Sequence, residues 1–148
     1  MNKFFLIVIL SCLFSSCKDN AELSKNELNE LKNNVINSGD DYSYSRLVLY
    51  YENKEDFYEL LPYSLIMAEK YNKGNGYLMV YKDLIRLINK GKFDQTALKD
   101  INKDSRENIL KYLERGSKLE KDGDCRFFLE KHYRFGVPPL ARASCSCQ

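Results

Sequence analysis

The chain has 148 residues, a length that fits one domain. Its 23 basic and 21 acidic side chains nearly balance, and no basic run forms an electrostatic footprint for phosphates, so the sequence gives no reason to expect a nucleic-acid partner. Tyrosine (11) and phenylalanine (8) are abundant, whereas proline (3) and glycine (7) are scarce. This composition favours long helices with an aromatic core over a sandwich with many turns.

Segment 1–16 has the features of a signal peptide. Lys3 gives a positive start, an apolar core follows over residues 4–14, and Ser15 and Ser16 are the small residues that a peptidase needs close to the cut. The core is too short to span a bilayer as a helix, which takes ~20 apolar residues. No second apolar stretch approaches that length, so we expect membrane attachment through lipid.

Cys17 follows directly, and the whole segment resembles a bacterial lipoprotein signal. The resemblance implies that Cys17 is lipidated and begins the mature chain, with residues 17–24 as the lipidated cysteine and its tether. Phe14 departs from the pattern, which usually has Leu, Val or Ile three residues before the cysteine. Cys12 is a rival lipidation site, and an ordinary cleaved signal or a retained anchor are further alternatives.

The residues after Cys17 bear on the choice of membrane. Lys18 stands where an aspartate would signal retention in the inner membrane. The run Cys17-Lys18-Asp19 also resembles the lysine-plus-acid export signals of Bacteroidetes surface lipoproteins. We therefore expect a protein anchored by acyl chains in the bacterial cell envelope, in the outer membrane, on its periplasmic or surface face.

Two helices are predicted before residue 53. The first begins at Ser24, whose spacing to Glu27 is that of a capping box, and ends at the break 37–40. Its apolar positions recur at helical spacing: Leu28, Leu31 and Val35. The second covers residues 42–52 and has one mainly apolar face: Tyr44, Leu47, Val48 and Tyr51.

A third helix is predicted over residues 56–72, where Asp56 and Glu59 again have capping-box spacing. Pro62 lies inside this segment and either kinks the helix or marks its true first turn. The sequence Lys-Gly-Asn-Gly then forms a strong break. A fourth helix follows over residues 77–89, with these apolar positions: Val80, Leu84, Leu87 and Ile88.

Two further helices are predicted in the rest of the chain. Residues 90–104 form a polar connection with one short turn near residues 96–98. The fifth helix starts at Asp104, which has capping-box spacing to Glu107, and reaches about residue 119. The sixth covers residues 125–135 and ends before Gly-Val-Pro-Pro, which cannot continue a helix.

Three similar breaks point to internal repeats: Gly39-Asp40, Gly74-Asn75 and Gly123-Asp124. The first two lie 35 residues apart, close to the ~34 of a helix-turn-helix repeat, and the third lies 49 further on, which fits one repeat plus the polar insertion. After each break a triple at four-residue spacing recurs: Ser43-Leu47-Tyr51, Val80-Leu84-Ile88 and Cys125-Leu129-Tyr133. Met67-Ala68-Glu69 aligns with Gly116-Ser117-Lys118, and the small residues there would let paired helices approach closely.

This arrangement resembles Sel-one-like repeats, which are relatives of tetratricopeptide repeats. The best copy is Tyr112-Leu113-Glu114-Arg115-Gly116-Ser117, then Gly123-Asp124-Cys125, Leu129, Tyr133 and Gly136-Val137-Pro138. The resemblance implies an all-α fold of about six helices in stacked helical hairpins, an α-solenoid fragment over residues 25–139, with residues 140–148 as a C-terminal tail. The alternative is a generic helical bundle whose apolar faces mimic the repeat spacing.

Residues that could hold a metal are few. His132 is the single histidine, and we expect a structural or surface role, because a triad or a zinc site needs a histidine among suitable partners. Residues 100–104 match the first ligand positions of an EF-hand loop. Ser105 and Lys111, however, stand where that loop needs its glycine and its bidentate glutamate. We therefore expect no metal and no cofactor.

Three cysteines besides Cys17 would remain in the mature chain: Cys125, Cys145 and Cys147. Outside the cytoplasm they could form a disulfide, and an odd number leaves at least one to stay unpaired or to pair between molecules. Cys125 occupies a small-residue position of the predicted core and could simply be buried. Cysteine-rich members of the resembled family bridge paired cysteines in each repeat, a pattern that this chain lacks.

The expected function is protein binding. Most tyrosines belong to the core at helical spacing, but three are predicted to face a concave groove, where aromatic anchors would bind a peptide or protein: Tyr44, Tyr51 and Tyr81. No catalytic constellation is visible, so we expect an adaptor, an assembly factor or a toxin-neutralising immunity-type inhibitor rather than an enzyme. The alternative is an enzyme acting on cell-wall material, with these nominal carboxylates: Glu107, Glu114 and Asp124.

Overall fold

The computed structural model describes residues 23–119 and 123–134, and within these ranges the fold is all-α. Six α-helices occur in the described part of the chain: α2 (Lys25–Ser38), α3 (Asp41–Asn53), α4 (Phe57–Leu65), α5 (Gly74–Ile88), α6 (Lys103–Ser117) and α7 (Asp124–Arg134). Two short turns accompany them, the π-helical η1 (Ile66–Lys70) and the 3-10 helix η2 (Gln95–Lys99). The predicted six helices and the short turn in the polar connection are confirmed.

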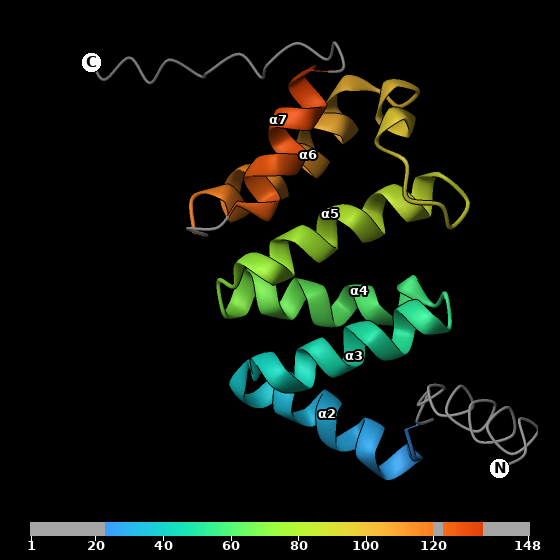
Figure 1. Ribbon diagram of the computed structural model, residues 1–148, viewed down its shortest axis with the longest axis vertical. Helices are drawn as coiled ribbons and strands as arrows, with labels where there is room; N and C mark the ends of the chain where they lie inside the picture. Colours follow the sequence, from blue (N-terminus) through green and yellow to red (C-terminus); the bar gives the residue numbers. More distant parts are fainter. Residues whose placement is uncertain (1–22, 120–122, 135–148) are drawn as a thin grey trace, which may run out of the picture.

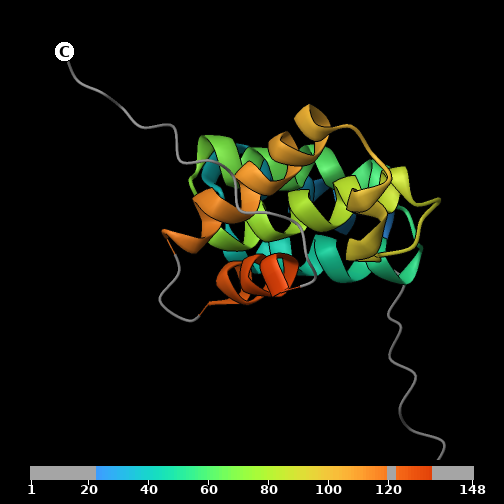
Figure 2. The ribbon, with the colours of Figure 1, turned by 90° about the horizontal axis from the view of Figure 1, so that it is seen from above.

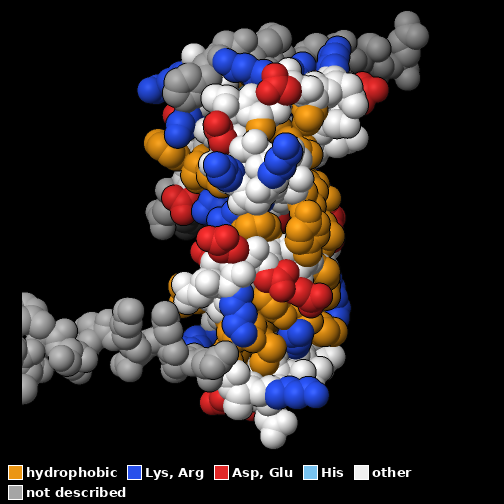
Figure 3. Space-filling view, turned by 90° about the vertical axis from the view of Figure 1, so that its right-hand side faces the viewer, with side chains coloured by type: hydrophobic (Ala, Val, Ile, Leu, Met, Phe, Trp, Pro, Cys, Tyr) orange, Lys and Arg blue, Asp and Glu red, His pale blue; other side chains and the backbone are white. Residues whose placement is uncertain are grey.

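The helices pair as three hairpins, α2–α3, α4–α5 and α6–α7, and the hairpins stack along the long axis of the molecule (Figure 1). The first hairpin lies at one end of the stack and the third at the other. On the face shown in Figure 3, charged side chains of both signs are interspersed with hydrophobic side chains along the stack. Viewed along the stack, α6 and α7 lie on opposite sides of α5, which packs against both (Figure 2). The predicted stack of helical hairpins is therefore correct.

Side-chain caps define where the helices begin. Ser24 and Glu27 form the predicted capping box, since the Ser24 amide donates to Glu27 at 2.8 Å and the Glu27 amide donates to Ser24 at 3.3 Å. Asp56 caps α4 as its spacing predicted. For α6 the prediction was wrong by two residues: Asn102 is the cap, accepting from the Ser105 amide at 2.8 Å.

The end of the third predicted helix differs from a plain α-helix. Pro62 lies in the interior of α4, so it does not mark the first turn. The chain then widens into η1, in which the Tyr71 amide donates to the carbonyl of Ile66, five residues earlier, at 3.3 Å. The wider turn brings the Tyr71 hydroxyl to within 2.8 Å of the Ile36 carbonyl at the end of α2.

Two glycines allow a close approach of neighbouring residues, Gly39 at the end of α2 and Gly76 inside α5. The Tyr71 ring occupies the space that a Cβ on Gly39 would fill, and Gly39 has a φ of +63°. Gly76 lies inside α5, which begins at Gly74, three residues before the predicted start. A Cβ on Gly76 would lie 2.6 Å from the Ala68 amide nitrogen, so this glycine lets α5 cross η1 closely.

The three hairpins cross at the same register. In each, a residue near the end of the first helix meets a small residue nine positions later, and the pairs are Asn34–Ser43, Met67–Gly76 and Gly116–Cys125. Asn34 donates to Ser43 at 3.3 Å, and a Cβ on Gly76 would lie 2.8 Å from Met67. A Cβ on Gly116 would overlap the sulfur of Cys125. The small residues therefore permit the close approach that the sequence predicted.

This register corrects one of the predicted triples. The second copy equivalent to Ser43-Leu47-Tyr51 and Cys125-Leu129-Tyr133 is Gly76-Val80-Leu84, one turn earlier than expected. Ile88, the last residue of the predicted triple, is 41% exposed at the end of α5. The buried side of α5 is formed mainly by other residues, with no exposed surface: Tyr77, Val80, Tyr81 and Ile85.

Candidate functional site

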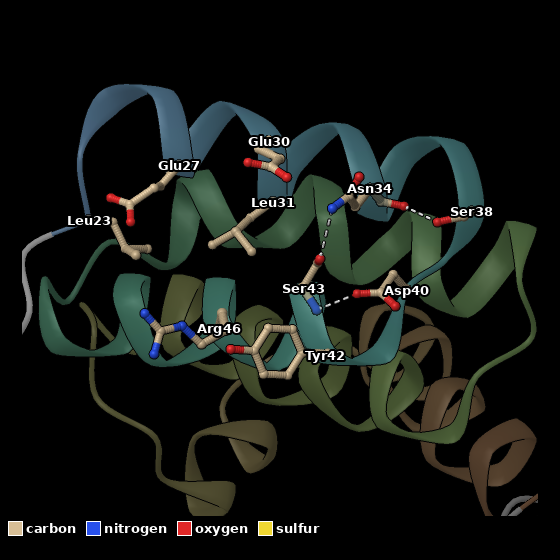
Figure 4. A pocket seen from close by; sticks show the side chains of 10 residues that line it. All are labelled: Leu23, Glu27, Glu30, Leu31, Asn34, Ser38, Asp40, Tyr42, Ser43 and Arg46. Carbon is tan, nitrogen blue, oxygen red and sulfur yellow. Dashed lines mark hydrogen bonds between the residues drawn. The ribbon is translucent and has the colours of Figure 1, made fainter.

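A groove of about 410 Å³ lies between α2 and α3 in the first hairpin (Figure 4). Its lining combines carboxylates, amides and apolar groups from both helices: Leu23, Glu27, Glu30, Leu31, Asn34, Ser38, Asp40, Tyr42, Ser43 and Arg46. The volume falls within the range of ~300–1,000 Å³ that is usual for ligand-binding clefts. We refer to this feature as the hairpin groove.

The two walls of the hairpin groove differ in chemistry. Glu27 and Glu30 project from α2, whereas Tyr42 and Arg46 project from α3 on the opposite side, with Leu31 between them (Figure 4). The Tyr42 side chain is 71% exposed, although it is a large aromatic residue. Hydrogen bonds of polar residues close one end of the groove, and the bond from Asn34 to the Ser43 hydroxyl joins the two helices (Figure 4).

Two groove carboxylates, Glu27 and Asp40, accept hydrogen bonds at the starts of α2 and α3. The hydrogen bonds from Ser24 lower the pKa of Glu27, and the nearby Arg46 acts in the same direction. The hydrogen bonds from Ser43, followed by the charge of Lys73, lower the pKa of Asp40. Both groups therefore keep their negative charge at neutral pH while they cap their helices.

Three other groove side chains cap no helix. The side chains of Glu30, Tyr42 and Arg46 make no hydrogen bond or ion pair within the described part of the chain. They come from both walls and offer a carboxylate, an aromatic ring and a guanidinium to the same space. A partner could bind all three without breaking a side-chain hydrogen bond or ion pair among the described residues.

A smaller hollow of about 290 Å³ lies on α6, at the other end of the stack. It is mainly basic and is lined by Asn108, Lys111, Tyr112, Glu114, Arg115 and Lys118. Arg115 is already paired with Glu69 at 2.6 Å and lies 4.8 Å from the centre of the Tyr77 ring. The groups of this hollow are thus more fully used within the fold.

A buried polar network joins three helices beneath the surface. Asp83 of α5 has no exposed surface. The Arg86 guanidinium forms ion pairs with Asp83 at 3.0 Å and with Glu52 of α3 at 2.9 Å. Ser64 of α4 donates to Asp83 at 3.4 Å and accepts from Tyr44 at 3.0 Å. Burial raises the pKa of Asp83 to about 6, against the opposing effect of Arg86.

This network holds helices in place rather than presenting a reactive group. The sequence analysis did not single out Asp83, which lies within the predicted helix over residues 77–89. One signal was available: Asp83 lies three residues after Val80 and two before Ile85, within the apolar face of α5. A carboxylate in such a face needs partners from neighbouring helices.

The three tyrosines predicted to line a groove are in the core instead. Tyr44, Tyr51 and Tyr81 are 1%, 4% and 0% exposed. The Tyr44 hydroxyl is used by Ser64, and the Tyr81 hydroxyl accepts from Gln95 at 2.6 Å. Helical spacing placed these rings correctly on an apolar face, but that face is directed into the stack.

His132 and Cys125 are both buried on α7. His132 is 2% exposed, and burial lowers its pKa, with the positive charges of Arg106 and Lys99 acting in the same direction. Cys125 has no exposed surface and its sulfur lies 3.8 Å from the Gly74 carbonyl. The other predicted cysteine sites lie outside the described residues: Cys17, Cys145 and Cys147.

The nominal carboxylates have different surroundings. Glu107 lies 3.7 Å from Lys103, and Glu114 accepts from Tyr133 at 3.4 Å. Seven residues of α-helix separate these two carboxylates, a rise of about 10 Å. Asp124 lies in the first turn of another helix, where a negative charge favours the helix N-terminus.

Comparisons with known proteins complete the description of the site. The chain matches no protein-family model, no curated protein and no solved structure. Within the described ranges, none of the helices has the length and apolar character needed to cross a membrane. The hairpin groove is therefore interpreted from its own geometry.

Proposed function

We propose that this protein is a lipid-anchored protein of the bacterial cell envelope that binds another protein. The lipoprotein-like segment ending at Cys17 supports the anchor. Stacked helical hairpins support the binding role, since such arrays present extended surfaces. The resemblance to Sel-one-like repeats agrees with a role as an adaptor, an assembly factor or an immunity-type inhibitor.

The hairpin groove is the observation that carries the proposal. It offers a space of about 410 Å³ and three side chains from opposite walls that form no hydrogen bond or ion pair among the described residues: Glu30, Tyr42 and Arg46. Exposed aromatic residues beside charged groups are typical of the residues that dominate protein interfaces. A partner segment that enters the groove would contact both helices of the first hairpin.

Site-specific photocrosslinking tests the binding role. A photoreactive phenylalanine analogue replaces Tyr42 in the full-length chain, and Tyr58 of α4 serves as the matched control, since these tyrosines are 71% and 70% exposed. We expect a stoichiometric crosslinked partner from position 42 and none from position 58. Equal crosslinking at both positions, or none at position 42, would contradict binding at the groove.

Phase partitioning tests the anchor separately. The full-length chain should enter the detergent phase of a Triton X-114 extraction, because acyl chains anchor it. Cys17→Ala should move the protein to the aqueous phase, whereas Cys12→Ala should leave it in the detergent phase. Retention of Cys17→Ala in the detergent phase would reject the assigned lipidation site.

A further inference from the structure

We propose that the hairpin groove selects a partner segment carrying a lysine or arginine side chain. The inference rests on the proposed function, because it names the partner chemistry of the same groove. Three properties of the groove support it: the balance of its charges, the apolar surface between those charges, and an exposed tyrosine ring that lacks the cation found on many other rings of this chain.

The groove carries an excess of negative charge. Its lining includes three carboxylates, from Glu27, Glu30 and Asp40, against the single guanidinium of Arg46. The capping hydrogen bonds described above keep Glu27 and Asp40 ionised, so they still contribute charge. A cationic side chain entering the groove would be attracted, and a carboxylate would be repelled.

The apolar part of the groove suits the stem of such a side chain. Leu31 lies between the two walls, and the ring of Tyr42 lies beside Arg46 on the α3 wall (Figure 4). Lysine and arginine carry an apolar stem and a charged end, and they bury the stem while the charge meets a partner. The stem would lie against Leu31 and Tyr42, and the charge would meet Glu30.

The tyrosines of the neighbouring helices show how this chain uses aromatic rings. Five of them lie within 4.4–5.7 Å of a lysine or arginine, measured to the ring centre: Tyr50, Tyr51, Tyr63, Tyr71 and Tyr77. Lys32 alone approaches two of these rings, at 5.7 and 5.6 Å. Tyr42 has no such cation among the described residues, and its exposed face is open to one from a partner.

The basic hollow on α6 does not compete for the same partner. Its Arg115 already has a carboxylate and a ring within the fold, and its remaining lysines would repel a cation. Opposite charges at the two ends of one stack would also attract a second copy of this chain to the hairpin groove. That outcome is built into the test, and it would overturn the proposal.

Nuclear magnetic resonance titration of the full-length chain in detergent micelles tests the selectivity. The probes are three blocked heptapeptides, acetyl-Gly-Ser-Leu-X-Leu-Ser-Gly-amide, in which X is arginine, glutamine or glutamate. We expect the arginine peptide to shift the backbone amides of Leu31, Tyr42 and Ser43 and to bind most tightly. Glu30→Gln should weaken this peptide about threefold, as removal of an exposed charge pair does.

Glu130→Gln is the matched control, because Glu130 is an exposed glutamate on α7 at the opposite end of the stack. It should leave the affinity unchanged. Equal or tighter binding of the glutamate peptide, shifts confined to other surfaces, or no shift with any probe at millimolar concentration would overturn the proposed selectivity. Sedimentation tests for self-association of the protein. Self-association that Glu30→Gln abolishes would assign the groove to a second copy of this chain and would also overturn the proposed selectivity.

The crosslinked segment from position 42 separates this inference from the proposed function. A segment containing lysine or arginine supports both, and Glu30→Lys should then abolish crosslinking while a lysine-to-glutamate change in that segment restores it. A segment without a basic residue would retain the binding function but overturn the cationic selectivity. Absence of any crosslink from position 42 overturns both.

Discussion

The Nη1 atom of Arg86 lies 3.0 Å from Oδ1 of Asp83, a carboxylate with no exposed surface. The other arm of the same guanidinium reaches Glu52 at 2.9 Å. One arginine therefore pairs with two carboxylates. Asp83 is the more deeply buried of the two, and burial makes its ionised form less favourable. Since Arg86 would keep its ion pair with Glu52 if Asp83 lost its charge, the network should tolerate neutralisation of Asp83.

Asp83→Asn should change how stability depends on pH. The folded protein holds the Asp83 proton more tightly than the unfolded chain does, with a pKa of about 6 against the usual 3.8, so this residue makes the fold more stable as pH falls from 7 towards 4. The shift corresponds to about 3 kcal/mol. Asp83→Asn should remove this gain and should be at least as stable as the parent protein at pH 7.

Urea unfolding at several pH values between 4 and 8 measures the effect, with Glu130→Gln as an exposed control. The relevant quantity is the difference in unfolding free energy between variant and parent, because other carboxylates titrate in both. A large loss of stability in Asp83→Asn at pH 7, with the same slope against pH as the parent, would show that Asp83 is ionised and well paired.

His132 should titrate below the ordinary histidine range. Burial and two nearby positive charges lower its pKa from 6.5, so folding favours the neutral ring, and this contribution to stability is lost as pH falls below 6.5. His132 is the single histidine of the chain, so its ring signal needs no assignment in an untagged protein. A midpoint at or above that of the urea-unfolded protein would indicate a carboxylate partner instead.

Gly116→Ala should destabilise the third hairpin. The added methyl group would overlap the sulfur of Cys125 and lie 3.0 Å from Cβ of Tyr77, so overpacking should cost about 1–3 kcal/mol. Cys125→Ala in the same chain should recover part of that loss, since it removes the sulfur. A double-mutant cycle by thermal unfolding measures the coupling, and simple additivity of the two changes would argue against this contact.

Asn102→Ala should lower stability by about 1 kcal/mol, because it removes the cap that accepts from the Ser105 amide. Asp104→Ala, two residues later, tests the cap that the sequence predicted and should cost less. The two variants therefore discriminate between the observed and the predicted start of α6. Equal losses, measured by chemical denaturation, would contradict the assignment of Asn102.

The helices could be predicted because their signals are local. Ser24 and Glu27 identify a helix start within four residues, and apolar residues at helical spacing identify which side is buried. The network around Asp83 could not be predicted in this way, because its partner Glu52 is on another helix 31 residues earlier. Spacing gives no information on which helix a buried side meets.

The sequence also could not predict which tyrosine lies in the groove. The sequence indicated that tyrosines matter in the first half of the chain, but Tyr44 and Tyr51 pack inside, whereas their neighbour Tyr42 is the ring that lies in the groove. One helical position is a rotation of about 100°, so an error of two residues turns a core residue into a surface residue. The groove itself depends on how two helices approach, which the small residue Ser43 permits.

The common crossing register has a consequence for how such a chain can change in length. Ser43 and Gly76, which occupy equivalent positions in consecutive hairpins, are 33 residues apart. A duplication or deletion of one such unit would place the same kind of contact surface against the next hairpin, whereas a shorter change inside a helix would rotate buried residues outward. Descendants of this gene should therefore differ by whole hairpins, or by insertions in the connections between them, as the extra residues between α5 and α6 already illustrate.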